Sequence, residues 1–254
     1  MTDAAFRPCV LIPVYDHEHA IGAVLAAVLS HDIRCVLVDD GSQSSCAQVL
    51  DALAAAAPAQ VTLLRHAVNR GKGAAVLTGF AHAASAGHTH VLQIDADGQH
   101  RVADLPLFLQ LSRDHPHAVI IGTPVYDASV PMGRLLARYL THVWVWINTL
   151  SFDIRDSMCG FRVYPVAPVL ALVQRQRLGQ YMNFDTEILV RLHWDGIAIL
   201  NQPTRVSYPS DGVSHFRLWH DNVLITRMHT ALFFGMLRRL PVLLWRRLRR
   251  WRRS

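Results

Sequence analysis

The chain has few of the residues that hold small secreted or metal-stabilised domains together. Its 254 residues include four cysteines with no C-x-x-C pair, so neither a zinc site nor a disulfide framework is expected, and a reducing cytoplasm fits. No apolar run approaches the roughly 20 residues of a membrane-spanning helix. No apolar run follows a basic patch at the N-terminus, so no signal peptide is expected. These absences predict a cytoplasmic protein with one sizeable core, or a core with an appendage.

Lysine is nearly absent, and the positive charge is unevenly distributed. Lys72 is the only lysine, and eight of the arginines lie in the last 17 residues, which contain no Asp or Glu. They are Arg238, Arg239, Arg246, Arg247, Arg249, Arg250, Arg252 and Arg253. Without these eight, 17 basic residues face 19 acidic ones, so the net charge of +6 becomes −2. The tail, more than the body, is predicted to need an anionic partner.

The first half of the chain alternates apolar runs with alanine-rich runs. Strands are predicted at 9–14, 34–38, 61–65, 91–94 and 118–121. Helices are predicted at 20–30, 45–57, 72–85 and 105–112. Apolar strands separated by helices favour an α/β fold with a mostly parallel sheet covered on both faces. Right-handed crossovers then bring the loops that follow the strands to one edge of the sheet, where ligands bind.

The second half of the chain is less regular. Helices are predicted at 132–150 and 184–194, and strands at 157–164 and 197–206. We divide the chain into a body, 1–216, and a basic amphipathic segment, 217–254. Apolar side chains and arginines interleave in that segment, which favours an interfacial helix on an anionic membrane. The alternative is a helix packed on the core with a solvated basic end. No nucleic-acid recognition motif accompanies the arginines, so nucleic acid is not expected as a partner.

Two aspartates directly follow a strand-like run at 89–94. If the chain stays extended there, Asp95, Asp97 and Gln99 share one face and converge on one cation. An oxygen-rich site of this kind suits Mg²⁺ or Mn²⁺ bridging the phosphates of a nucleotide. The alternative is a solvent-exposed acidic turn.

Two other loops carry groups that suit a nucleotide. Asp39 and Asp40 close the second strand, where a carboxylate can accept hydrogen bonds from a base or ribose, or can cap the next helix as an Asx turn. The stretch 69–73, Asn-Arg-Gly-Lys-Gly, precedes a helix. Its glycine amides could approach an anion, although a plain helix-entry turn explains the same pattern.

Four motifs stand in a fixed order at 10–15, 38–42, 69–73 and 95–100. With these four motifs the chain resembles family 2 glycosyltransferases over about residues 8–210. The resemblance is close to the dolichol-phosphate-mannose-synthase-like branch of that family. The stretches 156–162 and 184–189 resemble later parts of the same branch. The resemblance implies a GT-A fold and an inverting transfer from a UDP- or GDP-sugar to a lipid-linked acceptor of a bacterial envelope pathway. That acceptor would be a polyprenyl phosphate, or a hydroxyl on a lipid or polyene, at the inner face of the membrane.

The resemblance also implies roles for particular residues. The implied donor-binding residues are Pro13, Tyr15, Asp39, Asp40, Lys72, Asp95, Ala96, Arg134 and Arg162. Asp95, Asp97 and Gln99 would hold Mg²⁺ or Mn²⁺, which makes Asp97 a catalytic candidate, and the two arginines would meet a phosphate of the donor or the acceptor. Asp156 is a candidate base if the acceptor is a hydroxyl, with His215 as the alternative. The polar stretch 208–216 is a candidate lid.

Some features depart from the family pattern. An arginine usual after the fifth strand is replaced in Gly122-Thr123-Pro124, which weakens the expectation of a polyprenyl-phosphate acceptor. Asp16-His17 stands where Asn-Glu is usual, and the hairpin that spans the membrane in some members is absent. A non-catalytic nucleotide-sugar-binding or scaffold protein of the same fold remains an alternative. A nucleotidyltransferase is disfavoured, since the loop 15–19 has no glycine, lysine or arginine.

Overall fold

The computed structural model describes residues 6–125, 132–206 and 218–251, with the backbone alone described at 132–137, 218 and 250–251. Seven strands form one sheet: β1 (Pro8–Val14), β2 (Cys35–Asp39), β3 (Val61–Arg65), β4 (His90–Gln93), β5 (Val119–Val125), β6 (Arg162–Pro165) and β7 (Ile199–Arg205). Their order across the sheet is β3-β2-β1-β4-β6-β5-β7. β6 runs antiparallel to both β4 and β5, whereas every other pairing is parallel. The predicted mostly parallel sheet is confirmed.

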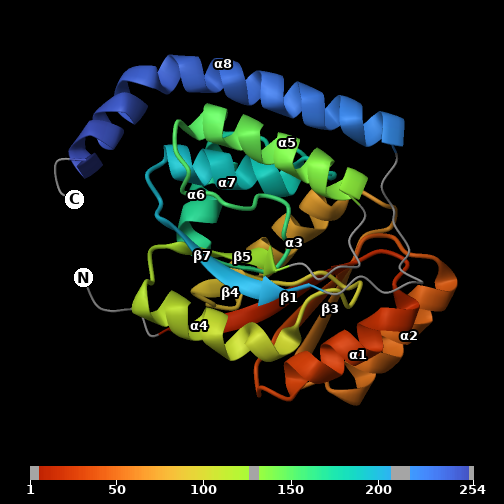
Figure 1. The fold of residues 1–254 in the computed structure, drawn as a ribbon. Coiled ribbons are helices and arrows are strands. Elements are labelled where there is room, and N and C mark those ends of the chain that lie inside the picture. Colours follow the sequence, from red (N-terminus) through yellow and green to blue (C-terminus); the bar gives the residue numbers. More distant parts are fainter. Residues whose placement is uncertain (1–5, 126–131, 207–217, 252–254) are drawn as a thin grey trace.

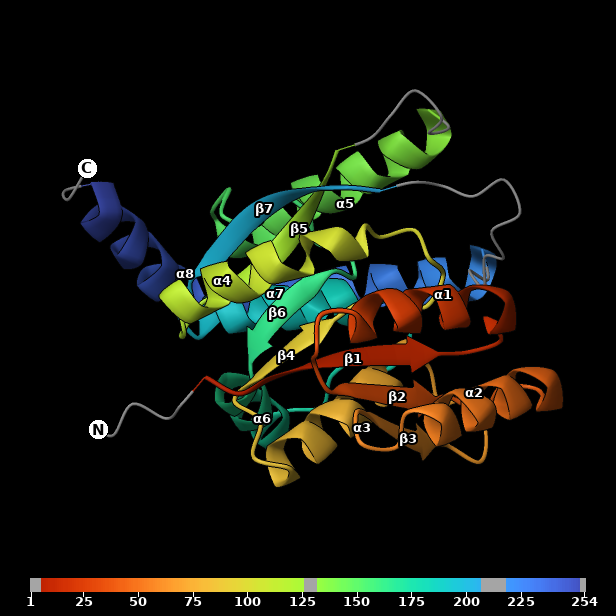
Figure 2. The ribbon, with the colours of Figure 1, turned by 90° about the horizontal axis from the view of Figure 1, so that it is seen from below.

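Helices cover both faces of this sheet. They are α1 (Glu18–Leu29), α2 (Ser44–Ala56), α3 (Lys72–Ser85), α4 (Leu105–Asp114), α5 (Met132–Thr149), α6 (Val166–Arg175), α7 (Phe184–Trp194) and α8 (Leu218–Trp251), with a short 3-10 turn at Val102–Asp104. Figure 1 shows α1, α2 and α4 on one side of the sheet and α5, α7 and α8 on the other. Seen from below, α1, α2 and α4 lie along the near face (Figure 2).

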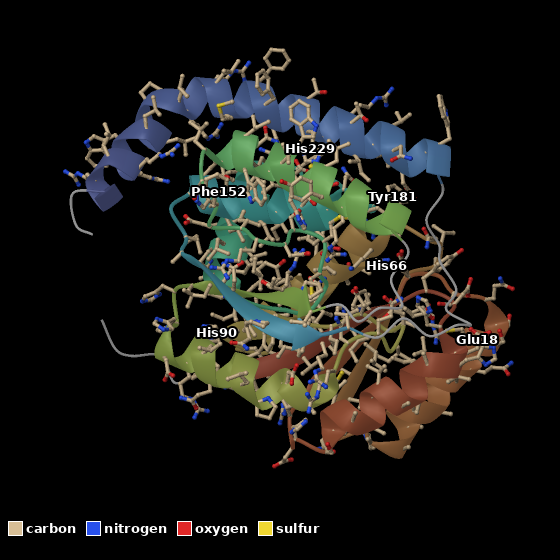
Figure 3. The ribbon with its side chains drawn as sticks, in the orientation of Figure 1. Glu18, His66, His90, Phe152, Tyr181 and His229 are labelled. Carbon is tan, nitrogen blue, oxygen red and sulfur yellow. The ribbon has the colours of Figure 1, made fainter. Side chains whose placement is uncertain are left out.

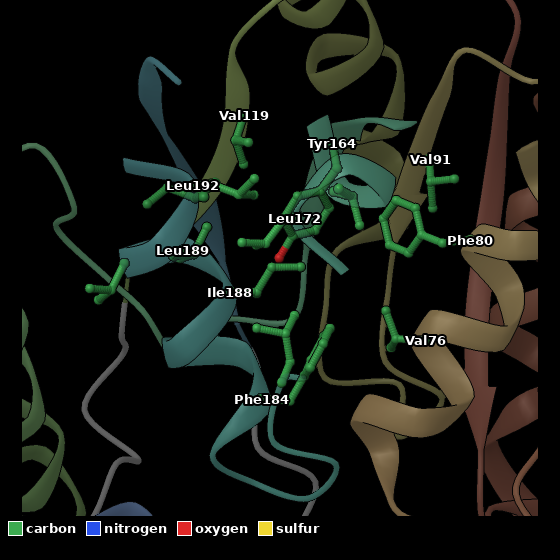
Figure 4. Close-up of a cluster of buried hydrophobic side chains, with 14 of the residues drawn as sticks. Val76, Phe80, Val91, Val119, Tyr164, Leu172, Phe184, Ile188, Leu189 and Leu192 are labelled. Carbon is green, nitrogen blue, oxygen red and sulfur yellow. The ribbon is translucent and has the colours of Figure 1, made fainter. Parts of the chain in front are cut away.

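The alternation of side chains along each strand builds a separate core on each face. In β1, Cys9 and Leu11 enter one cluster, while Val10, Ile12 and Val14 enter the other. The same alternation holds in the other central strands, as a period of two requires. Figure 4 shows the cluster on the side of α3 and α7, where aromatic and branched side chains interlock. Because both faces are covered, the central strand β1 is apolar along its whole length, and all of its residues after Pro8 are buried.

The long helix α8 packs into the core that contains Cys9 and Leu11 of β1, on the side of the sheet covered by α5 and α7. Its Met228, Leu232, Met236 and Leu243 are buried in the same cluster as β1 and β4, and the helix lies across α5 and α7 (Figure 1). Arg246 donates to the backbone carbonyl of Trp194 at the end of α7. The structure thus gives the predicted segment 217–254 an inner face that packs on the body.

The second half differs from its prediction at two places. The predicted strand 157–164 is largely wrong, because only Arg162–Pro165 pairs in the sheet. The amides of Met158 and Cys159 instead donate to the carboxylate of Asp156, which folds this stretch into a turn. Helix α6 was not predicted; it begins directly after β6.

Candidate active site

The loops that follow β1 and β2 are fastened to one another by hydrogen bonds. The carboxylate of Asp16 accepts from the backbone amide of Gln43, and the hydroxyl of Ser42 accepts from the amide of Asp16. Asp16 adopts a φ of 51°, a left-handed conformation that aspartate tolerates better than most residues. These contacts confirm that the polar loops predicted from the sequence meet at one edge of the sheet.

Asp39 and Asp40 close β2, and both carboxylates are occupied by protein donors. Asp39 is fully buried and accepts from the amide of Ser42 at 2.8 Å and from Nε of Arg65 at 2.7 Å. The first of these bonds is the turn that was the alternative explanation of the motif. In the described structure, each oxygen of Asp39 therefore accepts from a protein donor, and the side chain has no exposed surface.

Asp40 fastens the loop that precedes α3. Its carboxylate accepts from the amides of Arg70 and Gly71, at 3.0 and 2.7 Å, and lies 2.7 Å from Nδ1 of His66. The other ring nitrogen of His66, a residue labelled in Figure 3, contacts the hydroxyl of Thr78 in α3. Asp40 is 2% exposed, and its hydrogen bonds hold the loop before α3 in place.

The stretch 69–73 packs tightly against the segment that leads into α7. Gly71 has a φ of +93°, and a Cβ there would overlap the carbonyl of Gln180. The amide of Gly73 donates to that same carbonyl at 2.7 Å. Only glycine fits so close to another backbone with this φ. The arrangement places Lys72 at the first turn of α3, facing the end of β4.

Lys72 bridges two carboxylates from distant parts of the chain. Its Nζ lies 2.7 Å from an oxygen of Asp95, just beyond β4, and 2.7 Å from an oxygen of Asp185, in the first turn of α7. Burial alone would raise the pKa of Asp95, but the charges of Lys72 and His100 hold that pKa well below its usual range. The pKa of Lys72 is raised by the two carboxylates, in spite of burial.

Arg162 lies beneath this bridge and is fully buried. Its guanidinium donates to the carbonyls of Cys159, Ser157 and Asp185, and to the hydroxyl of Tyr164. At 0% exposure, with backbone carbonyls around it, this arginine holds the floor of the site together. The position disfavours the predicted contact between Arg162 and a substrate phosphate.

Residues 95–98 form a turn, so the condition under which Asp95, Asp97 and Gln99 would share one face, an extended chain, is not met. Gly98 has a φ of +73°, and the amide of Gln99 donates to the carboxylate of Asp97 at 3.0 Å. An aspartate that accepts from the amide two residues onward favours a turn over an extended chain. Burial, and then the negative charge of Asp95, raise the pKa of Asp97.

A pocket nonetheless brings all three of these side chains together with groups from the second half of the chain. It is lined by Asp95, Asp97, Gln99, His100, Pro124, Arg138, Met158, Cys159, Gly160 and Val206. Gly160 lies so close to Asp95 that a Cβ would overlap the carboxylate. Two acids and an arginine therefore face the same space.

Arg138 is held in this pocket by Asp156. Nε and Nη2 of Arg138 donate to the two carboxylate oxygens of Asp156, at 2.6 and 2.7 Å, which is a bidentate pair. Burial opposes the ionised form of Asp156, but His142, whose Nε2 lies 3.4 Å from the carboxylate, and the charge of Arg138 hold its pKa well below the usual range. A buried carboxylate with this pKa and these partners is a poor general base, and it orients the guanidinium instead.

The donor set suits a divalent cation that is shared with a substrate. Among the described residues, no three His, Cys, Asp or Glu side chains form a group that could hold a metal ion by themselves. Asp95 and Asp97 supply two carboxylates that face the pocket. Mg²⁺ at nucleotide sites is usually held by one or two carboxylates with the remaining positions filled by phosphate oxygens and water. The residues present therefore fit a metal that arrives with a diphosphate.

Of the remaining predicted donor-binding residues, Pro13, Tyr15 and Ala96 are not among those that line the pocket. Pro13 and Ala96 are buried, and Tyr15 is half-buried at the end of β1. Arg134 lies in the first turn of α5, and its side chain is outside the described residues, as are the predicted lid 208–216 and His215.

Three residues of the site were missed by the sequence reasoning. Asp185 holds Lys72, Arg138 lines the pocket, and His100 lies 3.6 Å from the carboxylate of Asp95. Asp185 stands inside the stretch 184–189, which the resemblance had already singled out, and that was an available signal. Arg138 lies one helical turn after Arg134, and nothing in the local sequence singles it out.

The mostly parallel seven-stranded sheet with helices on both faces is a GT-A-like α/β fold, and comparison with known proteins agrees. The chain belongs to glycosyl transferase family 2, whose sequence profile matches residues 9–178. It is therefore a glycosyltransferase, as the resemblance implied.

Three individual similarities are informative. An uncharacterized protein of Methanocaldococcus jannaschii is 25% identical over 81% of this chain and 90% of its own length. The polyprenol monophosphomannose synthase of Mycolicibacterium smegmatis is 30% identical over 62% of this chain, and the chain spans 61% of that relative's length. Among solved structures, glucosyl-3-phosphoglycerate synthase from Mycobacterium tuberculosis, in complex with Mn²⁺, UDP-glucose and phosphoglyceric acid, superimposes with a TM-score of 0.64, at 15% identity over 92% of this chain and 80% of the other. The last of these shows the fold alone.

Proposed function

We propose that this glycosyltransferase transfers a sugar, with inversion, from a UDP- or GDP-sugar to a polyprenyl phosphate at the inner surface of the membrane. The observation that carries the proposal is the pocket in which Asp95 and Asp97 face the same space as Arg138. The carboxylates suit the metal of a nucleotide diphosphate, and the guanidinium suits a second phosphate. Such a pocket has a place for a donor and for an anionic acceptor.

The donor side rests on Asp95, Asp97 and Lys72. When bound between the carboxylates and the diphosphate, Mg²⁺ or Mn²⁺ would neutralise the charge that develops on the departing nucleotide. Lys72 adds a fixed positive charge 2.7 Å from Asp95. Asp39 and Asp40 support the neighbouring loops through the bonds described above. The M. tuberculosis structure, which contains Mn²⁺ and UDP-glucose on a similar fold, supports a UDP-sugar donor used with a divalent metal.

The acceptor side rests on Arg138. A phosphate acceptor is already anionic, so it needs no base, whereas a lipid hydroxyl would need one. Asp156, the predicted base, is buried and engaged by Arg138, with its pKa held low. This geometry favours a phosphate over a hydroxyl. It also supplies a guanidinium that Gly122-Thr123-Pro124 lacks. The name of the mycobacterial relative, a polyprenol monophosphomannose synthase, points to the same class of acceptor.

The outer face of α8 suits an anionic membrane surface. Phe234, Leu237, Trp245 and Leu248 are exposed along it, and Trp245 packs under the guanidinium of Arg249. Exposed arginines flank these apolar side chains, which is the composition of an interfacial amphipathic helix. None of the helices that the structure describes has the length and apolarity needed to cross a bilayer. The helix would lie in the plane of the membrane, with its inner face kept on the body.

Transfer assays with labelled UDP- and GDP-sugars test the reaction. Polyprenyl phosphate is expected to accept sugar, while the corresponding polyprenol and free phosphoglyceric acid are not. Arg138→Gln should raise the KM for polyprenyl phosphate about tenfold or more, since a charge-assisted contact is lost, and should leave nucleotide binding unchanged. Arg175→Gln, on the exposed surface of α6, serves as the matched control. Equal transfer to the polyprenol would overturn the phosphate acceptor.

Vesicle sedimentation tests the membrane surface. Replacing Arg238, Arg247 and Arg249 by glutamine should release the protein from anionic vesicles, since each basic residue near such a surface contributes about 1 kcal/mol. The control is Arg227→Gln, an exposed arginine nearer the start of the same helix. Point variants are preferable to deletion, because Leu243 and Arg246 contact the body. Retention of the triple variant on the vesicles would rule out α8 as the anchor.

A further inference from the structure

Lys72 forms an ion pair with Asp95, one of the two carboxylates that the proposed metal needs. Its ammonium lies 2.7 Å from Asp95, and its side chain is 19% exposed. A lysine on a free surface would rotate away at little cost, because it is flexible and well hydrated. Lys72 is different, since the protein fixes it from both ends.

The backbone end of Lys72 is fixed by the loop that carries it. The amides of Arg70 and Gly71 donate to Asp40, and the amide of Gly73 donates to the carbonyl of Gln180. Bonds on both sides of Lys72 therefore set where its side chain begins. Much of the entropy cost of aiming a long side chain at Asp95 is already met by folding.

The ammonium end is fixed by Asp185. One oxygen of Asp185 is 2.7 Å from Nζ of Lys72, and the other accepts from Nε2 of Gln93 at 3.1 Å, with Arg162 at 3.6 Å. Asp185 is thus held by β4 and β6, and it faces the same ammonium as Asp95. If Lys72 moved off Asp95, it would still have a carboxylate beside it.

These charges leave little attraction for a divalent cation in the absence of substrate. Of the two carboxylates that face the pocket, Asp95 lies 2.7 Å from the ammonium of Lys72 and 3.6 Å from His100, while Asp97 accepts a hydrogen bond from the amide of Gln99. The described residues hold no third His, Cys, Asp or Glu that completes a metal site. A nucleotide diphosphate would bring both oxygen ligands and negative charge to the same place.

We infer that Lys72 is a resident cation that occupies Asp95 in the nucleotide-free enzyme, so that a divalent metal enters this site with the nucleotide diphosphate and not before it. The inference rests on the proposed function, which supplies the metal and the diphosphate. Within it, Lys72 is a positioning residue with two partners, and the arrival of the diphosphate allows its charge to be shared between Asp185 and a phosphate oxygen.

Counting free Mn²⁺ by electron paramagnetic resonance tests this without any assay of transfer. The wild-type enzyme without nucleotide should bind Mn²⁺ weakly. Lys72→Met, which keeps the length of the side chain and removes its charge, should bind Mn²⁺ about tenfold or more tightly, by the size of effect that a nearby cation has on a carboxylate. Lys72→Arg retains the charge and should stay within about twofold of wild type by the same reasoning.

The double variant Lys72→Met with Asp185→Asn guards against misfolding. Removing Lys72 alone leaves Asp185 with less compensation, whereas the double variant removes both charges. Melting temperatures identify any variant that has lost its fold. The double variant should also bind Mn²⁺ more tightly than wild type.

Lys72 is the only lysine in the chain, so ¹⁵N-lysine labelling gives a single Nζ resonance. Mg²⁺ alone should leave this resonance in place, and Mg²⁺ with UDP or GDP should shift it. Unchanged Mn²⁺ affinity in both folded Lys72→Met variants, or a shift with Mg²⁺ alone, would overturn the inference. If wild type binds neither nucleotide in a metal-dependent way, the proposed function fails instead, which is a distinct result.

Discussion

Two pairs of aspartates follow two strands of the same sheet, and they differ in the number of backbone amides that they accept from and in whether they line the pocket. Asp39 and Asp40 follow β2, and both accept from backbone amides, with Arg65 beside Asp39 and His66 beside Asp40. Asp95 and Asp97 follow β4 and line a pocket. The sequence patterns, Asp-Asp-Gly and Asp-Ala-Asp-Gly, are alike. An acidic strand end is therefore not by itself a ligand site.

The number of nearby donors accounts for the difference. Around Asp40, the glycine-rich stretch 69–73 presents two amides, and His66 adds a ring nitrogen. Asp97 has one amide, that of Gln99, in the described structure. Carboxylates accept several hydrogen bonds, and those that remain under-satisfied in a buried setting are suited to an added cation. Asp39 and Asp40 hold the neighbouring loops in place, and Asp95 and Asp97 line the pocket.

Among the substitutions that separate the two pairs of aspartates, Asp97→Asn should have the largest effect on nucleotide binding. Loss of the charged ligand is expected to weaken metal-dependent binding of UDP or GDP by about 100-fold or more, since even supporting residues of metal sites are worth 10–100-fold. The pKa of Asp97 is raised by burial and by Asp95, so a neutral amide should leave the free energy of unfolding unchanged or slightly higher. Calorimetry and chemical denaturation measure the two quantities. Undiminished nucleotide affinity would remove Asp97 from the metal site.

Asp40→Asn should give the opposite pattern, with stability as the main loss. The amide group of asparagine would face a backbone N–H, either of Gly71 or of Arg70, in a buried place. Leaving such a donor unsatisfied costs about 1–3 kcal/mol in the free energy of unfolding. Denaturation by urea, with Asp97→Asn alongside, measures this cost. A variant as stable as wild type would show that Asp40 does not hold the loop.

Gly160→Ala should affect Asp95, and not Asp39 or Asp40, and should weaken nucleotide binding less than Asp97→Asn does. The added Cβ overlaps the carboxylate of Asp95, so that side chain must shift, and metal-dependent nucleotide binding should fall about tenfold. Gly22→Ala is the matched control, because no atom lies within 4 Å of its added Cβ in α1. That change should stabilise the protein by about 0.5–1 kcal/mol and leave binding unaltered. Equal binding by both variants would contradict the tight packing at Asp95.

The sequence predicts the strands and helices of the first half well, because each has a clear period and a clear end. Lys72–Ser85 and Val61–Arg65 have the predicted bounds, and the mostly parallel sheet follows from their alternation. The second half is predicted less well. The turn at Asp156 is made by amides that donate to its own side chain, and such a local bond leaves no periodic pattern.

The site is predicted in part. The motifs bring the polar loops to one edge of the sheet, but they do not distinguish an arginine that lines a pocket from one that is buried. Arg162 is surrounded by carbonyls, whereas Arg138 reaches the pocket with Asp156 behind it. The buried position of Arg162 depends on the pairing of β6 with β4, a contact between residues some 70 positions apart. Long-range pairing of this kind is not written in local sequence.

A crystal structure with Mn²⁺ and UDP or GDP, phased to show the anomalous signal of manganese, tests the central claim most directly. The account predicts one manganese peak within coordination distance of Asp97 and of the diphosphate oxygens, with Asp95 on the same side of the ion. A peak elsewhere, or a nucleotide bound with Asp95 and Asp97 turned away from it, would contradict the account.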